Sequence, residues 1–594
     1  MEKRETKIYK LAKTRRTRLR PGGHLLILSC SKRKRETQRA VPALHLYDGV
    51  NFRVLRKFLL EAGWPPGLRV KILSARYGLI DATEIIEPYD LYLDKETAAR
   101  KNKTTLTELK DIYRPSSVFV NLGANYLPAI KGIERVFPNS NIKYARGGIG
   151  VKMTALKKWL ERLPRGTSDV KGHKGVKRSY LYIFPDWDDY IYEPFKAEPA
   201  GGGKGKKTYA YEACGKRIPF DGVLLSLSQL RSRKGALHRF KDGDGEPIPL
   251  RKELRIPKKI LLFGDCGAFS YAAEDAPPFT PEEAAALYHQ YGFDIGASVD
   301  HIPLPAIKAR KADGTTVSEP LSESRRYRRM YLTRDNAADF ISVCRSKKYG
   351  FAPLGVIQGL GVKSYVARLR EYVKMGYEHI ALGGLVPRTD DDIIRILCAV
   401  RREVQVLTAG RKSNLWVHLF GILRPNIQTV FKELGVSSFD SASYFRKAWL
   451  RSDQNYLAPD ASKWYGTIRV PISTSKAMIA GADSKRKQAR LPRMEKAVLN
   501  AIDSYHRTGR APKYFLDNIN KYSALLIRKS EDNHFDAKHK NLLKKKPWKA
   551  CSCPFCKKVG IHVVVFRGAN RNKRRGLHNT WVFYNRVLRD KAIK

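Results

Sequence analysis

The sequence lacks long apolar runs, and this absence excludes several classes of protein. No stretch of about 18 consecutive apolar residues occurs, so we expect no transmembrane helix and no membrane partner. The N-terminus is basic, but no apolar segment follows it as in a secretory signal peptide. We therefore expect a cytoplasmic protein, or one of the host cytoplasm if a phage encodes it.

Cysteine is also scarce, with eight residues in a chain of 594. Three of the cysteines are tightly clustered and the others are scattered, which is not the pattern of a disulfide framework. The pattern fits a reducing compartment and a single metal site.

Acidic residues are outnumbered about two to one. The chain has 57 Asp and Glu against 113 Lys and Arg, a formal net charge of +56. Such an excess indicates a polyanionic partner, most commonly nucleic acid, although adaptation of a whole proteome to an unusual environment is an alternative. Residues 1–22 form a basic tail that is either solvated or in contact with phosphates.

Residues 23–165 are predicted to form an α/β domain with a mostly parallel sheet. Ligands of such sheets bind beyond the carboxyl ends of the strands, where residues 29–34 and 74–78 offer hydroxyls, N–H groups and cations to an anion. Cys30 is either a nucleophile or, as we favour, a buried structural cysteine. We expect strands at 24–29, 70–74, 117–122 and 142–145, and helices at 51–62 and 153–163.

Four segments of this domain, LSCSKRK, LYDGVNFR, ILSARYGL and EPYDLYL, resemble the family of unknown function DUF6884. That family is similar to the YaaA-type proteins associated with DNA. The resemblance covers most of residues 24–94 and implies no defined activity.

A Gly- and Lys-rich linker is predicted at 166–178, followed by a (β/α)8 barrel at 179–450. Eight apolar strand candidates alternate with helical segments at 281–291, 337–347, 362–374, 390–404 and 426–434. The strand candidates are 180–184, 222–227, 259–263, 293–299, 353–357, 379–382, 415–420 and 437–439. Polar insertions are expected at 196–208 and 230–258.

Polar residues follow most of these strands. Barrel active sites lie at the carboxyl ends of strands, so carboxylates gathered there in a basic chain indicate a site, although strand ends also become polar without one. Gly264 and Gly267 allow a sharp turn and the close approach of a ligand. The polar residues are Asp186, Asp188, Asp189, Asp265, Asp300, His301, Gln358, His418 and Asp440, with the pair Gly383 and Gly384.

The clustered thiols are Cys551, Cys553 and Cys556, and a later histidine completes a tetrahedral set of ligands that selects zinc. Four protein ligands close the coordination sphere, so the zinc is structural. Both His562 and His578 are available for the fourth position. We predict a zinc-binding subdomain at 551–594, after a basic helical insertion at 451–550 with a helix near 484–507 and the run Lys544–Lys546.

Taken together, the motifs GDCGAFS, ASVDHIP, VIQGL, GYEHIALGGL, FGILRP, VSSFDSAS and CSCPFC…LHNTW resemble the tRNA-guanine transglycosylases. The resemblance implies that Asp265 is the general acid/base and Asp440 the nucleophile. It also implies that Asp300 and Gln358 read the base, that Gly383 and Gly384 pack against it, and that His578 is the fourth zinc ligand. Phe269 or Tyr271 would stack on the base.

Ala268, Ser270 and Leu360 depart from that family, and over a hundred residues separate Asp440 from Cys551. These departures, with the segment IFPDWDDYIY, resemble the DpdA-like branch, which inserts 7-deazaguanines into DNA. The resemblance implies a guanine/7-deazaguanine pentosyltransferase that uses DNA, a preQ0-type free base and structural Zn²⁺, and that works beside other proteins of a DNA-modification system. A transglycosylase acting on tRNA and a non-catalytic nucleic-acid-binding subunit are the alternatives.

Overall fold

The computed structural model describes most of the chain, including the predicted strand ends of the barrel from Asp265 to Asp440 and the predicted zinc ligands. The basic tail 1–22, the linker 166–178 and Asp186–Asp188 lie outside the described residues. The described residues are 23–35, 40–62, 64–65, 67–110, 115–163, 180–185, 189–195, 205–215, 217–231, 240–241, 245–310, 316–408, 415–425, 427–449, 454–482, 484–509, 515–523 and 532–588.

Two compact units divide the chain. The first comprises residues 1–181, 226–250 and 263–439, and the second comprises 182–225, 251–262 and 440–594. The described residues contain no helix long and apolar enough to cross a membrane.

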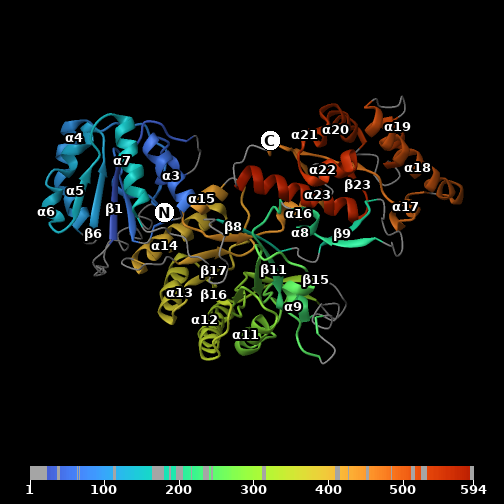
Figure 1. Ribbon diagram of the computed structural model, residues 1–594, viewed down its shortest axis with the longest axis horizontal. Coiled ribbons are helices and arrows are strands. Elements are labelled where there is room, and N and C mark those ends of the chain that lie inside the picture. Colours follow the sequence, from blue (N-terminus) through green and yellow to red (C-terminus); the bar gives the residue numbers. More distant parts are fainter. Residues whose placement is uncertain are drawn as a thin grey trace. The chain divides into compact units, whose positions relative to one another are not determined.

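A five-stranded sheet forms the centre of the N-terminal part of the first unit (Figure 1). Its order is β4-β3-β1-β6-β7, and β1 is parallel to both of its neighbours, β3 and β6. Only β4 runs antiparallel, as a return from β3, so the predicted mostly parallel sheet is confirmed. The strands are β1 (Gly23–Ser29), β3 (Leu68–Ser74), β4 (Gly78–Asp81), β6 (Pro115–Asn121) and β7 (Asn141–Tyr144).

Helices cover both faces of this sheet. On one face α3 (Val50–Ala62) and α7 (Ile149–Glu161) bury apolar residues at helical spacing, such as Phe52, Leu55 and Leu59, against Leu26 and Leu28 of β1. The opposite face packs on α4 (Lys95–Arg100), α5 (Asn102–Lys110) and the 3₁₀ helix η1 (Ala124–Ile130). Because both faces are covered, the central strand β1 has a continuous apolar run, Leu25–Leu28, rather than an alternating pattern.

A closed barrel of eight strands confirms the predicted (β/α)8 architecture. Every strand pairing that is described in it is parallel, so the carboxyl ends of the strands share one rim. In barrel order the strands are β11 (Gly222–Ser226), β12 (Leu261–Asp265), β13 (Ile295–Ala297), β16 (Ala352–Ile357), β17 (His379–Leu382), β18 (Trp416–Leu419), β19 (Ser438–Asp440) and β8 (Leu181–Phe184).

The helices between these strands are α11 (Pro281–Gln290), α12 (Glu323–Ser346), α13 (Val362–Met375), α14 (Asp390–Leu407) and α15 (Gln428–Glu433). The prediction of a helix at 337–347 was too short, because α12 begins 14 residues earlier, at Glu323. A hairpin of β14 (Ala306–Arg310) and β15 (Thr316–Pro320) before α12 was not predicted.

The second unit is mainly helical after the barrel. Its basic helix α18 (Lys485–Thr508) confirms the helix predicted near 484–507, and Ser484 caps its first turn. The region predicted as helical also holds short strands, β20 (Tyr456–Leu457), β21 (Trp464–Tyr465) and β22 (Ile468–Arg469), where aromatic and β-branched residues favour extended backbone. The remaining elements include α17 (Lys476–Gly481), α19 (Phe515–Ser523), α20 (Asp532–Lys545), α22 (Pro554–Val559), η6 (Gly560–Val564) and α23 (Gly568–Val582).

Candidate functional site

Asp300 is the centre of a buried polar cluster beyond the carboxyl end of β13. The Nε2 of Gln358, which follows β16, donates to Asp300 Oδ2 at 2.6 Å. The thiol of Cys266, which follows β12, donates to Asp300 Oδ1 at 2.9 Å. The Tyr271 hydroxyl lies 2.9 Å from the Asp300 carbonyl oxygen and 3.0 Å from the Cys266 sulfur. Three barrel strands therefore hold one carboxylate in a fixed orientation.

Burial dominates the electrostatics of this cluster. Asp300 is 4% exposed, and burial raises the pKa of its carboxyl, although hydrogen bonds from Cys266 and Gln358 lower that pKa in part. Burial also raises the pKa values of the Cys266 thiol and the Tyr271 hydroxyl, so both remain protonated donors. The pKa of the neighbouring His301 is lowered to about 4, first by burial and then by Arg329, so its imidazole is neutral at pH 7.

Gln358 has an unused acceptor. Its Oε1 atom is buried and has no hydrogen-bond partner among the described residues. Gly383 and Gly384, which follow β17, lie against this amide: a Cβ on Gly383 would lie 2.2 Å from Nε2, and one on Gly384 would lie 2.7 Å from Oε1. Both positions therefore require glycine if the Gln358 amide is to keep its place.

Asp265 is the last residue of β12 and is half-buried. A carboxylate oxygen of Asp265, the Cys266 sulfur and an oxygen of Asp300 all lie within 4.8 Å of one another. The turn after Asp265 is tight, because Gly267 has φ +86° and the hydroxyls of Ser226 and Ser228 occupy the space of a side chain. Phe269, in the same turn, is 61% exposed, whereas Tyr271 is buried.

Asp440 is the last residue of β19 and is 7% exposed. It is the first residue of its segment in the second unit, where the next residue, Ser441, accepts a hydrogen bond from the Tyr182 hydroxyl at 2.7 Å. The first unit thus brings together Asp265, Asp300, Gln358, Gly383 and Gly384. The assignment of Asp440 to the same site stays a prediction.

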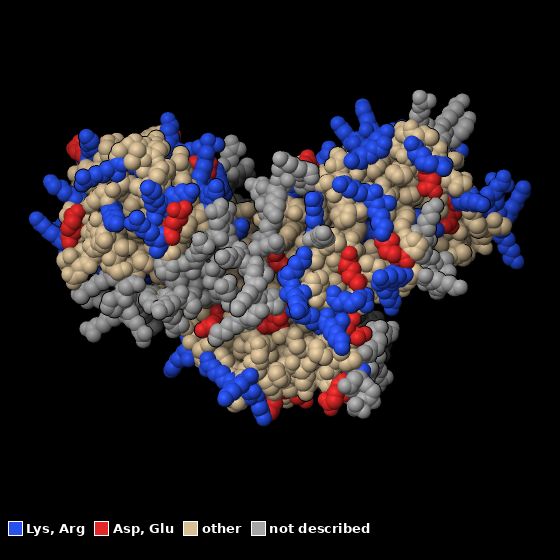
Figure 2. Space-filling view, in the orientation of Figure 1, with Lys and Arg blue, Asp and Glu red and all other residues tan. Residues whose placement is uncertain are grey.

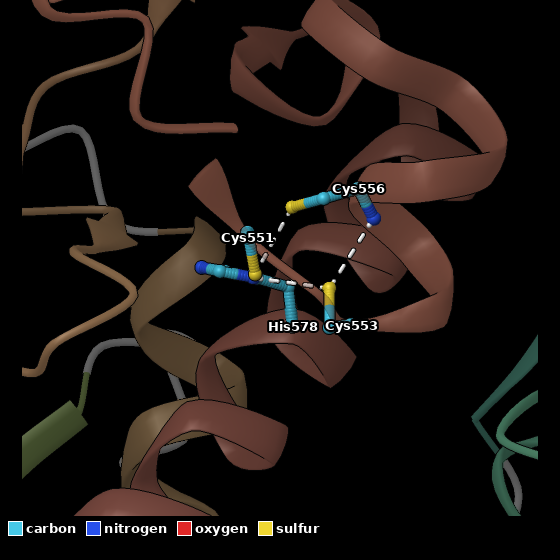
Figure 3. A group of neighbouring side chains, drawn as sticks. All are labelled: Cys551, Cys553, Cys556 and His578. Carbon is cyan, nitrogen blue, oxygen red and sulfur yellow. Dashed lines mark hydrogen bonds between the residues drawn. The ribbon is translucent and has the colours of Figure 1, made fainter. Parts of the chain in front are cut away.

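The second cluster is a candidate metal centre (Figure 3). Cys551, Cys553, Cys556 and His578 are buried, and one donor atom from each lies within 4.8 Å of all the others. His578 Nδ1 lies 3.5 Å from the sulfur of Cys551 and 3.4 Å from the sulfurs of Cys553 and Cys556. Its Nε2 lies 2.8 Å from the Leu457 carbonyl oxygen, which orients the ring with Nδ1 towards the sulfurs.

These residues fit a structural zinc ion. Three thiols and one imidazole are the donors that zinc prefers, and four protein ligands leave no open position. The Tyr456 ring stacks on the His578 ring at 4.1 Å, nearly parallel, and shields the cluster. The alternative ligand, His562, is excluded because its Nε2 lies 2.7 Å from Asp503 Oδ1.

Two side chains that hold Asp300 could not be recognised as doing so from the sequence. Cys266 has no predicted role, and Tyr271 is predicted to stack on the base as an alternative to Phe269, whereas both side chains are buried against Asp300. Their spacing gave a usable signal, because Cys266 directly follows Asp265 and Tyr271 closes the same small-residue turn.

Basic side chains are more abundant than acidic ones on the face of the protein that Figure 2 shows. Figure 2 shows more Lys and Arg than Asp and Glu over both the N-terminal domain and the C-terminal helices on the visible face. The distribution suits a partner that carries many negative charges.

Two comparisons relate this chain to known proteins. Residues 25–158 match the family of unknown function DUF6884. A DNA-guanine transglycosylase from Salmonella montevideo is 32% identical over 427 residues, which cover 68% of this chain and 96% of that protein.

Relatives of lower identity are named tRNA-guanine transglycosylases. The tRNA-guanine(15) transglycosylases of Thermococcus onnurineus and Thermococcus kodakarensis are 25% and 28% identical over 47% and 41% of this chain. The matches span only 42% and 35% of the lengths of those two proteins. The chain therefore belongs to the DNA-guanine transglycosylase family of the guanine transglycosylase superfamily, and it carries an N-terminal DUF6884 domain.

Proposed function

We propose that this protein exchanges guanine in DNA for a 7-deazaguanine base of the preQ0 type through a covalent aspartyl-glycosyl intermediate. One observation carries the proposal: Asp300 and Gln358 form a rigid, buried pair in which one amide oxygen remains unpaired. Such a pair is suited to the polar edge of a planar base.

The chemistry of the two bases fits this pair. Guanine presents N–H donors and a carbonyl acceptor on its pyrimidine ring, and a 7-deazaguanine keeps that edge unchanged. Asp300 can accept hydrogen bonds from the ring N–H and the amino group, and Gln358 can contribute its amide. One set of contacts therefore serves both the leaving and the entering base, as an exchange reaction requires.

In the proposed reaction, Asp440 attacks C1′ of the target nucleotide, the C1′–N9 bond breaks and an ester to Asp440 forms. Asp265 gives its proton to the departing guanine. Asp265 then takes a proton from the incoming 7-deazaguanine, whose N9 attacks C1′ and releases the Asp440 carboxylate. The target base must first leave the helix, which costs a few kcal/mol. Phe269 would stack on the base, and its exposure in the turn after Asp265 supports this role.

The proposed zinc ion would be held by Cys551, Cys553, Cys556 and His578. When bound it supplies structural cross-linking rather than catalysis, because its ligands come from the segment before α22, from α22 itself and from α23, and they fill every position.

Replacement of Asp440 tests the mechanism. Asp440→Ala should abolish the exchange of labelled guanine into duplex DNA and leave DNA binding intact. Asp275→Ala, which removes an exposed carboxylate paired with Arg325, is the matched control and should keep full activity. Normal exchange by the Asp440 variant would refute the mechanism.

A tRNA substrate is the second candidate, favoured by the similarity to the tRNA-guanine(15) transglycosylases. Parallel incubation of the protein and preQ0 with duplex DNA and with tRNA separates the two, and we expect incorporation into DNA alone. A third candidate is a non-catalytic binding subunit. It would be favoured if no covalent protein–nucleic acid adduct could be trapped on either substrate.

A further inference from the structure

The carboxyl edge of the sheet in the DUF6884 domain carries polar groups that the proposed exchange reaction does not use. From β1 the chain passes first to β3 on one side and later to β6 on the other, so β1 and β6 flank a topological switch point. Ligands of open parallel sheets bind in the crevice outside such a point.

A glycine-rich loop and a helix begin at this edge. The loop Arg146–Gly150 follows β7 and leads into α7, whose N-cap, Gly148, has no side chain to accept the free N–H groups of the first turn. No acidic residue lies in that turn. A Cβ on Gly148 or Gly150 would meet no atom within 4 Å, so the space before the helix is open. Free N–H groups at the positive end of a helix attract an anion.

An unpaired donor lies beneath this helix start. Asn121 ends β6, is 2% exposed, and its Nδ2 has no hydrogen-bond partner among the described residues. Alternation along β6 places Asn121 on the same face as Phe119, whose ring stacks at 5.2 Å on Trp159 of α7. Lys152, in the first turn of α7, donates to the Leu122 carbonyl oxygen at 3.0 Å, which ties the helix start to the end of β6. The Asn121 amide therefore lies below the N-terminus of α7.

The neighbouring strand ends add polar groups and cations. Cys30, directly after β1, lies 3.1 Å from the Tyr126 hydroxyl, and Ser74, at the end of β3, lies 2.8 Å from the Tyr89 hydroxyl. The loops after β1, β3 and β7 carry cations, and Lys152 adds one in the first turn of α7. The loop cations are Lys32, Arg33, Lys34, Arg76 and Arg146, of which Arg33 is paired with Asp48. Neutral polar side chains thus lie at the strand ends, and basic side chains lie in the loops around them.

Exposed apolar side chains border the same helix start. Ile149 and Val151 are 71% and 62% exposed, although they belong to a helix whose other face is buried. Apolar surface beside an anion site suits a ligand with a phosphate and a flat ring. We propose that this edge of the sheet binds the phosphate of a nucleotide at the N-terminus of α7, with the base against Ile149. The nucleotide is either free or part of a DNA strand.

Gly150→Asp in the full-length protein tests the site. Position 150 is open, and an acidic residue in a first helical turn stabilises the helix, so the melting temperature should not fall. The new carboxylate repels a phosphate. Gly150→Asn, of the same size but neutral, is the matched control.

The readout is hydrogen–deuterium exchange of the peptide that spans residues 145–156. We expect dGMP or a single-stranded oligodeoxynucleotide to slow exchange at least fivefold in the wild-type and Asn proteins, and not in the Asp protein. Protection by dGMP identifies a free mononucleotide site, and protection by the oligonucleotide alone identifies a strand site. Deoxyguanosine and inorganic phosphate should protect weakly.

The proposal is overturned if neither ligand protects the wild-type protein, if the Asp variant is protected equally, or if deoxyguanosine or inorganic phosphate alone protects as well as the better of the two ligands. The Asp440→Ala variant should keep the protection, so failure of this proposal and failure of the exchange mechanism remain distinguishable.

Discussion

A methyl group added at Gly383 should impair recognition of the base while the protein stays folded. In Gly383→Ala the new Cβ would lie 2.2 Å from Gln358 Nε2, so the amide must move by roughly 1 Å to reach an ordinary contact distance. That amide is buried and bonded to Asp300 at 2.6 Å, and a shift of this size breaks the bond.

The size of the effect follows from the lost bond. A hydrogen bond to a charged group contributes about 1.5–3 kcal/mol. If base binding depends on it, kcat/KM for exchange should fall about 10- to 100-fold, mainly through KM for the free base. Gly361→Ala is the matched control, because a Cβ there meets nothing within 4 Å and φ is −171°, a value that any residue adopts.

The assay measures the incorporation of labelled guanine into duplex DNA at several base concentrations, with melting temperature recorded for each variant. Activities of the two alanine variants within twofold of each other would refute the assignment of Gln358 and Asp300 to base binding.

Three other changes test separate parts of the structure. Asp300→Asn should lower exchange about 100-fold, yet raise the melting temperature at pH 7. Burial raises the pKa of Asp300 in the folded protein, so the wild-type protein loses stability as pH rises above the unfolded-state pKa of about 3.9. The higher melting temperature of the variant should therefore disappear below about pH 4. A melting temperature of the variant below that of the wild type at pH 7 would contradict this explanation. His578→Ala should reduce bound zinc, measured by atomic emission, from about one ion per chain to near zero, whereas His562→Ala should retain it; the reverse result would exchange their roles. Glu495→Ala removes the carboxylate that pairs with the largely buried Arg567 guanidinium and that accepts from the Ser473 N–H, so urea unfolding should show a loss of about 3–5 kcal/mol. A loss below about 1 kcal/mol would mean that solvent reaches the pair.

The barrel and the three zinc-binding thiols could be predicted because their signals are local, whereas the choice of His578 over His562 depended on the family resemblance. Each strand is a short apolar run followed by polar or small residues, and the thiols fall within six residues of one another. The interactions around Asp300 could not be predicted in the same way. Its partners come from positions 34 and 58 residues away, and only the folded barrel places Cys266 and Gln358 on its two oxygens.

The first half of α12 shows a different limit. Its sequence is rich in arginine and has too few apolar residues to display helical periodicity. In the structure Arg329 is 3% exposed and donates to the carbonyl oxygens of Ala272, Ile302 and Glu274. A charged side chain that donates to backbone carbonyls thus occupies a buried position of the helix. A prediction from hydrophobic periodicity assigns such a residue to the solvent-exposed face and so misses the helix.

The interleaving of the two compact units restricts how this protein can be divided. Each unit takes three separate segments of the chain, and the boundaries fall at residues 181, 225, 250, 262 and 439. A cut or a gene split between residues 181 and 439 therefore removes part of both units at once. The N-terminal sheet is different, because its strands and covering helices come from the single stretch 23–163. That stretch is continuous in sequence, but its Arg56 and Trp64 contact Glu433 and Arg401 of the barrel helices α15 and α14. A transglycosylase that lost the stretch would therefore have to replace the partners of two buried charged side chains.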